Sequence, residues 1–169
     1  DVLIKVEMTD GNSDIFLGTH QGKMIRFSEE DARPMGRVSR GVRGINLEEG
    51  DYVIGMSLYR EDGKLLVVSE NGYGKKTELD EYKVQNRGGK GIFTYKITDK
   101  TGKIAGTRTV TDEDDIMAIT DGGVVIRTHV GEVPVYNRSA SGVRVIRISE
   151  GNKVAKMTFT DREDDEEEI

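Results

Sequence analysis

One heptad of the sequence carries groups that could bind phosphate. Residues 85–91 read QNRGGKG, with two amides, two cations, three glycines and no apolar side chain to bury. Glycine lets backbone N–H groups approach an anion closely, because it has no Cβ and tolerates positive φ. Arg87 and Lys90 would neutralise phosphate charge, and Gln85 and Asn86 could donate to phosphate or sugar oxygens. The alternative is a glycine-rich hairpin connection, which explains the glycines but not the placement of the cations.

The heptad belongs to one of three stretches, here called the basic windows, that contain cations and no acid. The windows are residues 32–47, 82–98 and 133–149. Their cations are Arg33, Arg37, Arg40, Arg43, Lys83, Arg87, Lys90, Lys96, Arg138, Arg144 and Arg147. A single charged stretch is usually only a solvated surface. Three such stretches at one phase of a repeat predict a continuous basic stripe, which is typical of a path for a polyanion.

The windows recur because the whole chain repeats with a period of about 50 residues. Ile4, Ile54, Ile104 and Val154 stand at this spacing, and each begins an apolar stretch. Two further sets of segments align, at 14–27, 63–77 and 115–128 and at 41–45, 88–92 and 142–146. A repeat of this length is the sequence signature of a solenoid or a propeller.

Each repeat predicts four short strands separated by turns that contain glycine. In the first repeat these are residues 15–19, 23–27, 42–47 and 52–59. Helical periodicity is weak, and only 28–32 and 79–82 are compatible with about one helical turn. Four strands in about 50 residues is the size of a propeller blade. A tandem Greek-key or sandwich array is the competing geometry.

We therefore expect an all-β, propeller-like fold of about three blades. The expected blades lie near residues 13–60, 61–110 and 111–160, and residues 1–10 are expected to form the last strand of a preceding blade. Three blades are too few to close a propeller, which typically needs four to eight. The sequence thus predicts an incomplete disc and a fragment of a larger domain.

Composition places the charge unevenly. The net charge of −6 equals the charge of the tail at 161–169, which has seven acids and one arginine, so residues 1–160 balance to zero. We interpret the tail as either a solubilising segment or a competitor for the basic stripe. The chain has no cysteine and hence no disulfide or thiolate metal site. No apolar run is long enough to span a bilayer, and a cytoplasmic location fits best.

The heptad also resembles a known motif, the gyrase A-box, whose usual pattern is Gln, basic, Arg, Gly, Gly, basic, Gly. The matching residues are Gln85, Arg87, Gly88, Gly89, Lys90 and Gly91, whereas Asn86 replaces a basic residue. The box marks the C-terminal domain of the A subunit of bacterial DNA gyrase. The repeats, which cover nearly the whole chain, are similar to the blades of that domain. The usual box lies in the first blade, whereas here at least one blade precedes it.

The resemblance implies a fold, a function and partners. It implies a β-pinwheel, in which neighbouring blades exchange strands, with double-stranded DNA wrapped around a basic perimeter. It also implies an A2B2 enzyme, formed with the rest of the A subunit together with the B subunit, that introduces negative supercoils in the bacterial nucleoid using ATP. ATP and Mg would act on other parts of that enzyme, so we expect no cofactor in this chain.

Other classes of function remain as alternatives. A topoisomerase IV domain is related but usually has an eroded box. A β-propeller scaffold that binds protein would need an exposed aromatic or apolar surface, yet aromatics are only 6% and tryptophan is absent. The acidic cluster at 111–115 could hold a metal but is better explained as a solvated turn. With no nucleophile motif or nucleotide-binding loop, we expect neither catalysis nor a metal site.

Overall fold

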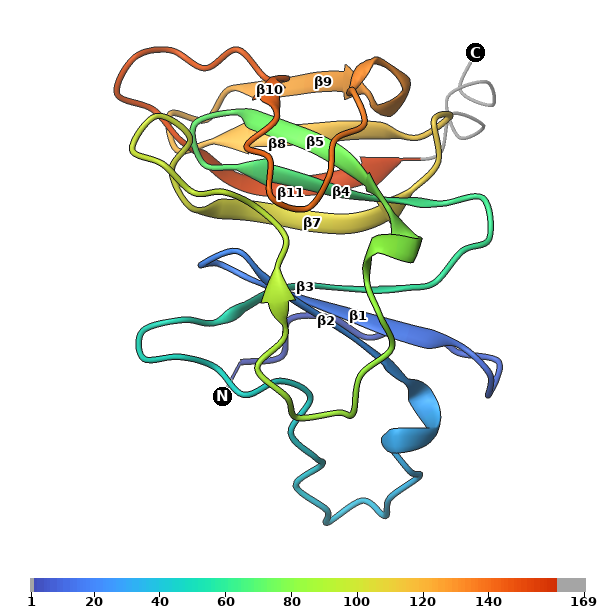
Figure 1. The fold of residues 1–169 in the computed structure, drawn as a ribbon. Helices are drawn as coiled ribbons and strands as arrows, with labels where there is room; N and C mark the ends of the chain where they lie inside the picture. Colours follow the sequence, from blue (N-terminus) through green and yellow to red (C-terminus); the bar gives the residue numbers. More distant parts are fainter. Residues whose placement is uncertain (1, 161–169) are drawn as a thin grey trace, which may run out of the picture.

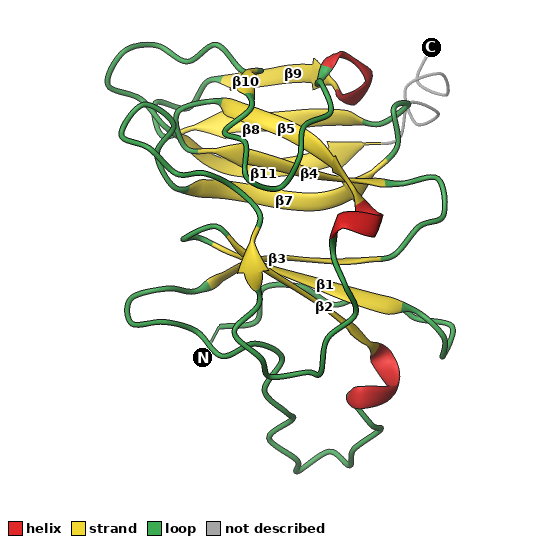
Figure 2. Ribbon diagram, viewed as in Figure 1, coloured by secondary structure: helices red, strands yellow, loops and turns green. Residues whose placement is uncertain are grey.

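The structure, a computed structural model, describes residues 2–160, so the predicted acidic tail lies outside the described residues. This part of the chain is almost entirely strands and turns, with three one-turn 3-10 helices (Figures 1 and 2). No helix among residues 2–160 is long and apolar enough to cross a membrane. The helices η1 (Glu29–Asp31) and η2 (Leu79–Glu81) confirm the two helical turns predicted from the sequence, and η3 (Val130–Glu132) is a third.

The strands repeat in the same order along the chain. They are β1 (Asp14–Thr19), β2 (Lys23–Ser28), β3 (Val53–Leu58), β4 (Lys64–Ser69), β5 (Tyr73–Glu78), β6 (Ile92–Phe93), β7 (Ile104–Val110), β8 (Asp115–Thr120), β9 (Val125–His129), β10 (Val143–Arg144) and β11 (Val154–Thr160). The hairpins β1–β2, β4–β5 and β8–β9 are antiparallel, and β3, β7 and β11 pair with the first strand of their own hairpin. The all-β prediction is confirmed.

Two short strands cross from one repeat to the hairpin of the repeat before. β6 pairs with β2 and β10 pairs with β5, which gives the sheet orders β3-β1-β2-β6 and β10-β5-β4-β7. This is the strand exchange expected of a β-pinwheel. The third sheet has the order β11-β8-β9, and within the described residues no strand covers the free edge of β9, where Val125 is 53% exposed.

Exchange explains why the strand predicted at 42–47 is wrong. These residues form no strand, although they stand at the same phase of the repeat as β6 and β10. β6 and β10 each pair with the hairpin of an earlier repeat, and no such hairpin precedes residues 42–47 in the part that the structure describes. A lone extended segment has no ladder of hydrogen bonds to hold it.

The strand predicted within residues 1–10 is also missing. Residues 2–10 form no strand, and Leu3 and Met8 are largely exposed. The later segments at this phase, such as β7, pair with the first strand of the hairpin that precedes them in the same repeat. No hairpin precedes residues 2–10 among the described residues. Their apolar segment therefore has no strand with which to pair.

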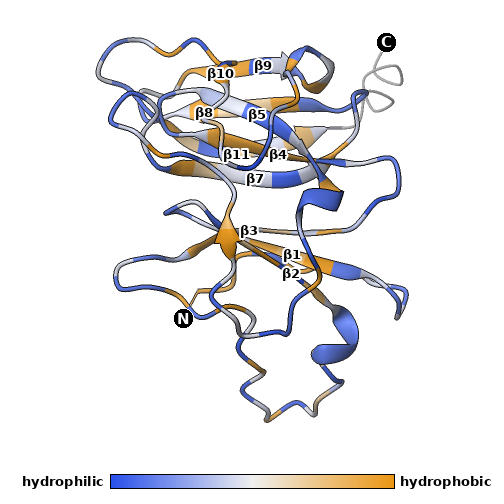
Figure 3. Cartoon of the chain, in the orientation of Figure 1, coloured by the Kyte–Doolittle hydropathy of each residue, from blue (hydrophilic) through white to orange (hydrophobic). Residues whose placement is uncertain are grey.

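The three sheets follow one another and pack through their inner strands. β3 packs against β7, and β7 packs against β11, so these three strands lie at the centre of the array (Figure 1). Ile104 is fully buried in a cluster that joins the first two sheets, and Val154 is buried in one that joins the last two. Figure 3 shows hydrophobic residues concentrated on the strands and hydrophilic ones on the loops and helical turns.

Backbone hydrogen bonds between consecutive sheets explain the 50-residue period. The Ile104 N–H donates to the His20 carbonyl (2.9 Å), and the Val154 N–H donates to the Glu70 carbonyl (2.8 Å). In both cases the inner strand of one repeat begins against the hairpin turn of the repeat before. The isoleucine period in the sequence therefore marks the contact that stacks the sheets.

The seam between the first two sheets predicts an asymmetry between two glycines at equivalent positions. A Cβ on Gly55 of β3 would lie 2.7 Å from the backbone oxygen of Thr107, whereas one on Gly106 of β7 would meet the flexible end of Met157. Gly55→Ala should lower the free energy of unfolding by about 2 kcal/mol through overpacking, and Gly106→Ala by less than about 1 kcal/mol. Urea denaturation of both variants tests this, and equal losses would contradict the tight seam.

Candidate nucleic-acid interface

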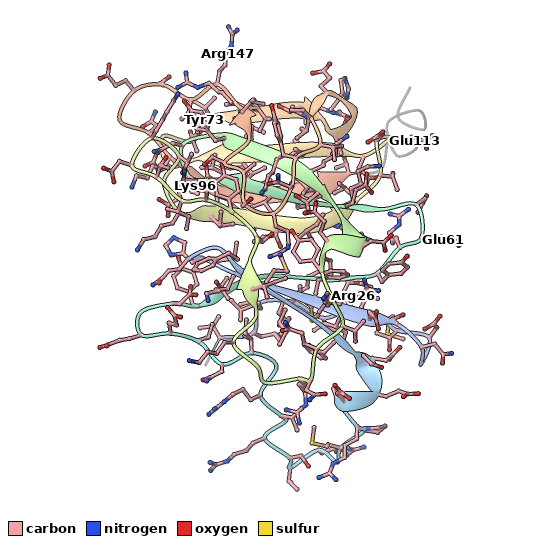
Figure 4. All side chains as sticks on the ribbon, in the orientation of Figure 1. Arg26, Glu61, Tyr73, Lys96, Glu113 and Arg147 are labelled. Carbon is pink, nitrogen blue, oxygen red and sulfur yellow. The ribbon has the colours of Figure 1, made fainter. Side chains whose placement is uncertain are left out.

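The basic windows lie along the outer edge of the array. Since β3, β7 and β11 pack together at the centre, the exchanged strands β6 and β10 occupy the opposite edges of their sheets, and both strands lie within basic windows. In Figure 4, Lys96 of the second window lies on the side of the molecule opposite Glu61 and Glu113. We call the outer edge the basic rim.

Most of the predicted cations are accessible on this rim. The exposed ones are Arg33, Arg37, Arg40, Arg43, Lys83, Lys90, Lys96, Arg144 and Arg147. Arg87 and Arg138 are partly buried instead. In the heptad, Asn86 is exposed, whereas Gln85 and the three glycines are half-buried. The two partly buried arginines thus stand apart from the other nine cations.

Arg87 fastens the heptad to the repeat before it. Its Nε donates to the carbonyl of Asp31 (2.9 Å) and its Nη1 to the carbonyl of Arg43 (2.6 Å), while its backbone N–H donates to the Asp31 carboxylate (3.3 Å). The Asn46 N–H in turn donates to the carbonyl of Gly89 (2.8 Å). These bonds join the heptad to the basic window of the first repeat.

Arg138 makes two of these three contacts one repeat later. Its Nη1 donates to the carbonyl of Phe93 (2.9 Å), and its backbone N–H donates to the Glu81 carboxylate (3.2 Å). The Lys96 N–H donates to the carbonyl of Ala140 (3.4 Å). Each partner stands 50 or 51 residues beyond its counterpart around Arg87. We call this recurring set of bonds the arginine latch.

The exchanged strands correct the alignment of the repeats. Ile92 lies opposite Met24, and Val143 lies opposite the equivalent residue Gly74, so Gly91 rather than Gly88 corresponds to Gly142. The expected alignment of 88–92 with 142–146 was therefore three residues out of register. The corrected alignment places the heptad on residues 136–142, which read YNRSASG, and on 35–41, which read MGRVSRG.

Two glycines of the heptad serve the backbone rather than an open anion site. Gly91 has φ +71°, and a Cβ there would lie 2.7 Å from the Met24 carbonyl oxygen. The N–H of Gly88, at φ +81°, donates to the Gly44 carbonyl (2.7 Å). The expectation that the glycines free backbone N–H groups for phosphate is thus wrong for Gly88, because the preceding repeat occupies its amide.

The first repeat shows the same loop without a neighbour to hold it. Residues 33–43 are exposed throughout, and the loop projects beyond the first sheet (Figure 1). Arg37 occupies the position of Arg87 and Arg138, but no repeat precedes it among the described residues. The comparison within one chain indicates that the arginine latch requires a preceding sheet.

Sequence reasoning missed a buried cation behind the rim. Lys75, in the middle of β5, is fully buried and donates through Nζ to the carbonyls of Asn137 (2.6 Å) and Arg138 (2.8 Å). Its ammonium lies over the ring of Tyr95 (5.4 Å), and burial lowers the pKa of Lys75 to about 8. The lysine lies at a core-facing position of a strand, which is the signal that could have revealed it.

The acidic cluster at 111–115 is divided among separate partners. Lys76 Nζ lies 2.6 Å from Asp112, and this hydrogen bond lowers the pKa of Asp112. Asp114 accepts from the N–H of Thr111, and Asp115 pairs with Arg127 at 2.6 Å and with His129. Asp112 and Asp115 thus pair with cations of the sheets, whereas the windows contain no acid.

Strand exchange in an open array of small antiparallel sheets defines the class of protein: the chain is part of a propeller-like β-pinwheel. Its sequence identifies the family. Residues 13–59, 63–111 and 114–161 match the family described as the DNA gyrase C-terminal domain, beta-propeller. The chain belongs to this family, and the three matched segments correspond to the three repeats.

Similar proteins agree with this assignment. The DNA gyrase A subunit of Staphylococcus epidermidis (strain ATCC 12228 / FDA PCI 1200) is 46% identical over 167 residues, which are 98% of this chain and 19% of that protein. The corresponding protein from Staphylococcus aureus (strain MRSA252) is 43% identical over 169 residues, 99% of this chain and again 19% of that protein. The chain thus spans about a fifth of these relatives.

Two solved structures share the fold. The C-terminal domain of DNA topoisomerase IV superposes with a TM-score of 0.87 at 28% identity, covering 94% of this chain and 50% of that one. The DNA gyrase A C-terminal domain gives a TM-score of 0.79 at 27% identity, covering 86% of this chain and 50% of that one. The predicted β-pinwheel and the predicted family are confirmed.

The arginine latch predicts that the heptad arginine stabilises the fold. Arg87→Ala should lower the free energy of unfolding by about 2 kcal/mol, because it removes two charge-assisted hydrogen bonds to carbonyls. Lys90→Ala, three residues away and exposed, should change it by less than about 0.5 kcal/mol. Denaturant unfolding compares the two, and amide exchange at Asn46 should quicken only in Arg87→Ala. Equal stabilities would contradict the latch.

Burial of Lys75 predicts a stability that increases with pH. The folded chain loses the lysine proton near pH 8, whereas the unfolded chain keeps it to about pH 10.4. The unfolded state therefore binds more protons in this interval, and the free energy of unfolding should rise from pH 8 to pH 10. Unfolding titrations at these pH values test it, and Lys75→Met should flatten the rise. A rise that persists in Lys75→Met would assign it to another group.

Proposed function

We propose that this chain binds double-stranded DNA along the basic rim without base-sequence preference and bends it around the array. The phosphates would be contacted by the exposed cations of the windows, together with Asn86 and Gln85 of the heptad. The latched arginines Arg87 and Arg138 would add charge while holding their loops in place. Binding of this kind reads backbone charge and DNA stiffness, not base edges.

The observation that carries the proposal is the recurrence of one arrangement in successive repeats. The arginine latch brings the second window beside the first and the third window beside the second, so the cations follow one another along one edge. Bending a duplex of 20–30 base pairs costs of order 1–6 kcal/mol. Many phosphate contacts along a curved edge can offset this cost, whereas an isolated basic loop cannot.

We further propose the larger enzyme in which this DNA binding takes place. The chain would be part of a DNA gyrase A subunit, which assembles with the B subunit as A2B2 in the bacterial cytoplasm, at the nucleoid. DNA wrapped on the rim would support ATP-dependent negative supercoiling. Cleavage, ATP and Mg would belong to other parts of that enzyme, and this chain would need no catalytic residue, cofactor or metal.

A domain of topoisomerase IV is the second candidate, favoured by the TM-score of 0.87 to its C-terminal domain. The 46% identity to the A subunit of a gyrase and the six matching positions of the heptad favour gyrase. Both candidates predict DNA binding on the rim. A protein-binding scaffold predicts none, and is the outcome that a DNA titration would expose.

The proposal predicts how rim cations set the salt dependence of binding. The double variant Lys90→Ala/Lys96→Ala should bind a random 40-base-pair duplex more weakly, with the slope of log K against log salt reduced by about two. Lys64→Ala, a cation outside the windows and 3.8 Å from Glu78, is the matched control and should keep the slope. Anisotropy gives the affinity, and energy transfer between labelled duplex ends gives the bend.

Three results would count against the proposal. An equal loss of slope in Lys64→Ala would mean that binding follows total charge and not the rim. Binding without a rise in energy transfer would remove bending from the proposal and leave only DNA binding. Wild-type chain that fails to bind at low salt would overturn both parts.

A further inference from the structure

The exchanged strands present one outward side chain at the same position of each repeat. In β6 this residue is Phe93, which lies opposite Lys23, and in β10 it is Arg144, which lies opposite the equivalent Tyr73. Arg43 stands at this position in the first repeat. Two of the three positions thus carry an exposed arginine, and the middle one carries an aromatic ring.

Both sheets hold a cation against an aromatic ring here, with the roles reversed. Lys23 Nζ lies 4.2 Å from the ring centre of Phe93, whereas the Arg144 guanidinium lies 5.3 Å from that of Tyr73 and donates to its hydroxyl (3.2 Å). Tyr73 is buried beneath its arginine, but Phe93 is 62% exposed above its lysine. The second sheet therefore presents a cation to the rim, and the first presents a phenyl ring.

Phe93 is held in place by two cations, and the lysine under its ring also lies 3.8 Å from Glu48. The Phe93 carbonyl accepts from Arg138 in the arginine latch, and its ring rests on Lys23, whose side chain is only 16% exposed. Beside it is a hollow of about 420 Å³, lined by Gln21, Phe93, Tyr95, Lys96, Ile97 and Ser139. Figure 3 shows the short arrow of β6 in the hydrophobic colour. Phe93 therefore presents an exposed ring, held over a lysine, at the edge that also carries the exposed cations of the windows.

We propose that Phe93 is an apolar contact to the DNA, touching sugar and base edges of the groove that faces the rim between flanking phosphates. This inference rests on the proposed function and adds to it a contact that is independent of salt. The acid-free windows on both sides argue for DNA as the occupant, because phosphates complement their charge. Replacing the outward ring leaves the carbonyl bond to Arg138 intact, so the fold should tolerate the change.

If Phe93 contacts the DNA, two substitutions at this position should change the salt dependence of DNA affinity in different ways. Phe93→Ala should weaken binding of the 40-base-pair duplex roughly fivefold at every salt concentration with an unchanged slope, because an apolar contact releases no counterions. Phe93→Arg, which makes all three positions arginine, should steepen the slope by about one. Its affinity curve should cross that of the wild type, tighter at low salt and weaker at high salt.

A tryptophan reporter gives an independent readout, since the chain contains no tryptophan. Phe93→Trp should bind with near wild-type affinity and change its emission when duplex is added. Tyr59→Trp, just beyond β3 at the opposite edge of the same sheet, is the control and should not respond. Equal emission changes at both positions would contradict a local contact at residue 93.

The results of these experiments distinguish failure of the Phe93 contact from failure of the proposed DNA-binding function. Suppose that the wild type binds with a steep salt slope but the affinity of Phe93→Ala is unchanged, or that Phe93→Arg binds more tightly at all salt concentrations. Either result overturns the Phe93 contact and leaves the proposed DNA binding intact. Absence of salt-dependent binding by the wild type overturns the proposed function and this inference together.

Discussion

Strand exchange is the constraint on which the rest of this structure depends. A hairpin with one added strand leaves a row of backbone donors and acceptors open at its edge, and three strands bury little surface. β6 and β10 close those edges with strands from the following repeat. Each sheet is therefore completed by its neighbour, so consecutive repeats cannot take independent orientations. The free edge of β9 and the absence of a strand at residues 42–47 show what a repeat lacks without that neighbour.

Strand exchange also determines the positions of the cations along the outer edge. The segment that leads into each exchanged strand must cross the seam between sheets, and the arginine latch and the Lys75 bonds hold this crossing. Cations on the crossing segments consequently keep a fixed spacing along the outer edge, while the acids at 60–63 and 111–115 stay with the turns between repeats. The heptad thus first connects consecutive repeats, and this role explains Gly88, Gly91 and Arg87 before any ligand is considered.

Much of this was predictable from sequence, and the rest was not, for physical reasons. The period that includes Ile104 and Val154 reports a contact between consecutive repeats, and it predicted the architecture. Strands of two residues carry no periodicity, so nothing local could assign β6 to β2. Gly88 and Gly91 are the same residue type, and only cross-strand register selects Gly91 as the equivalent of Gly142. The direction of Arg87 depends on a carbonyl 44 residues away.

Because the basic rim is formed where consecutive repeats contact each other, DNA binding on it would be coupled to folding. On the proposed function, a duplex along the rim would span at least one seam, with one phosphate near the first window and the next near the heptad docked on it. Such a ligand has higher affinity for the latched arrangement than for a separated one, and it stabilises the latch by the same free energy difference. The carbonyls of Asp31 and Arg43 keep the Arg87 charge at the seam whether or not DNA is present. The edge is therefore pre-organised, and DNA would meet cations whose positions the fold has already fixed.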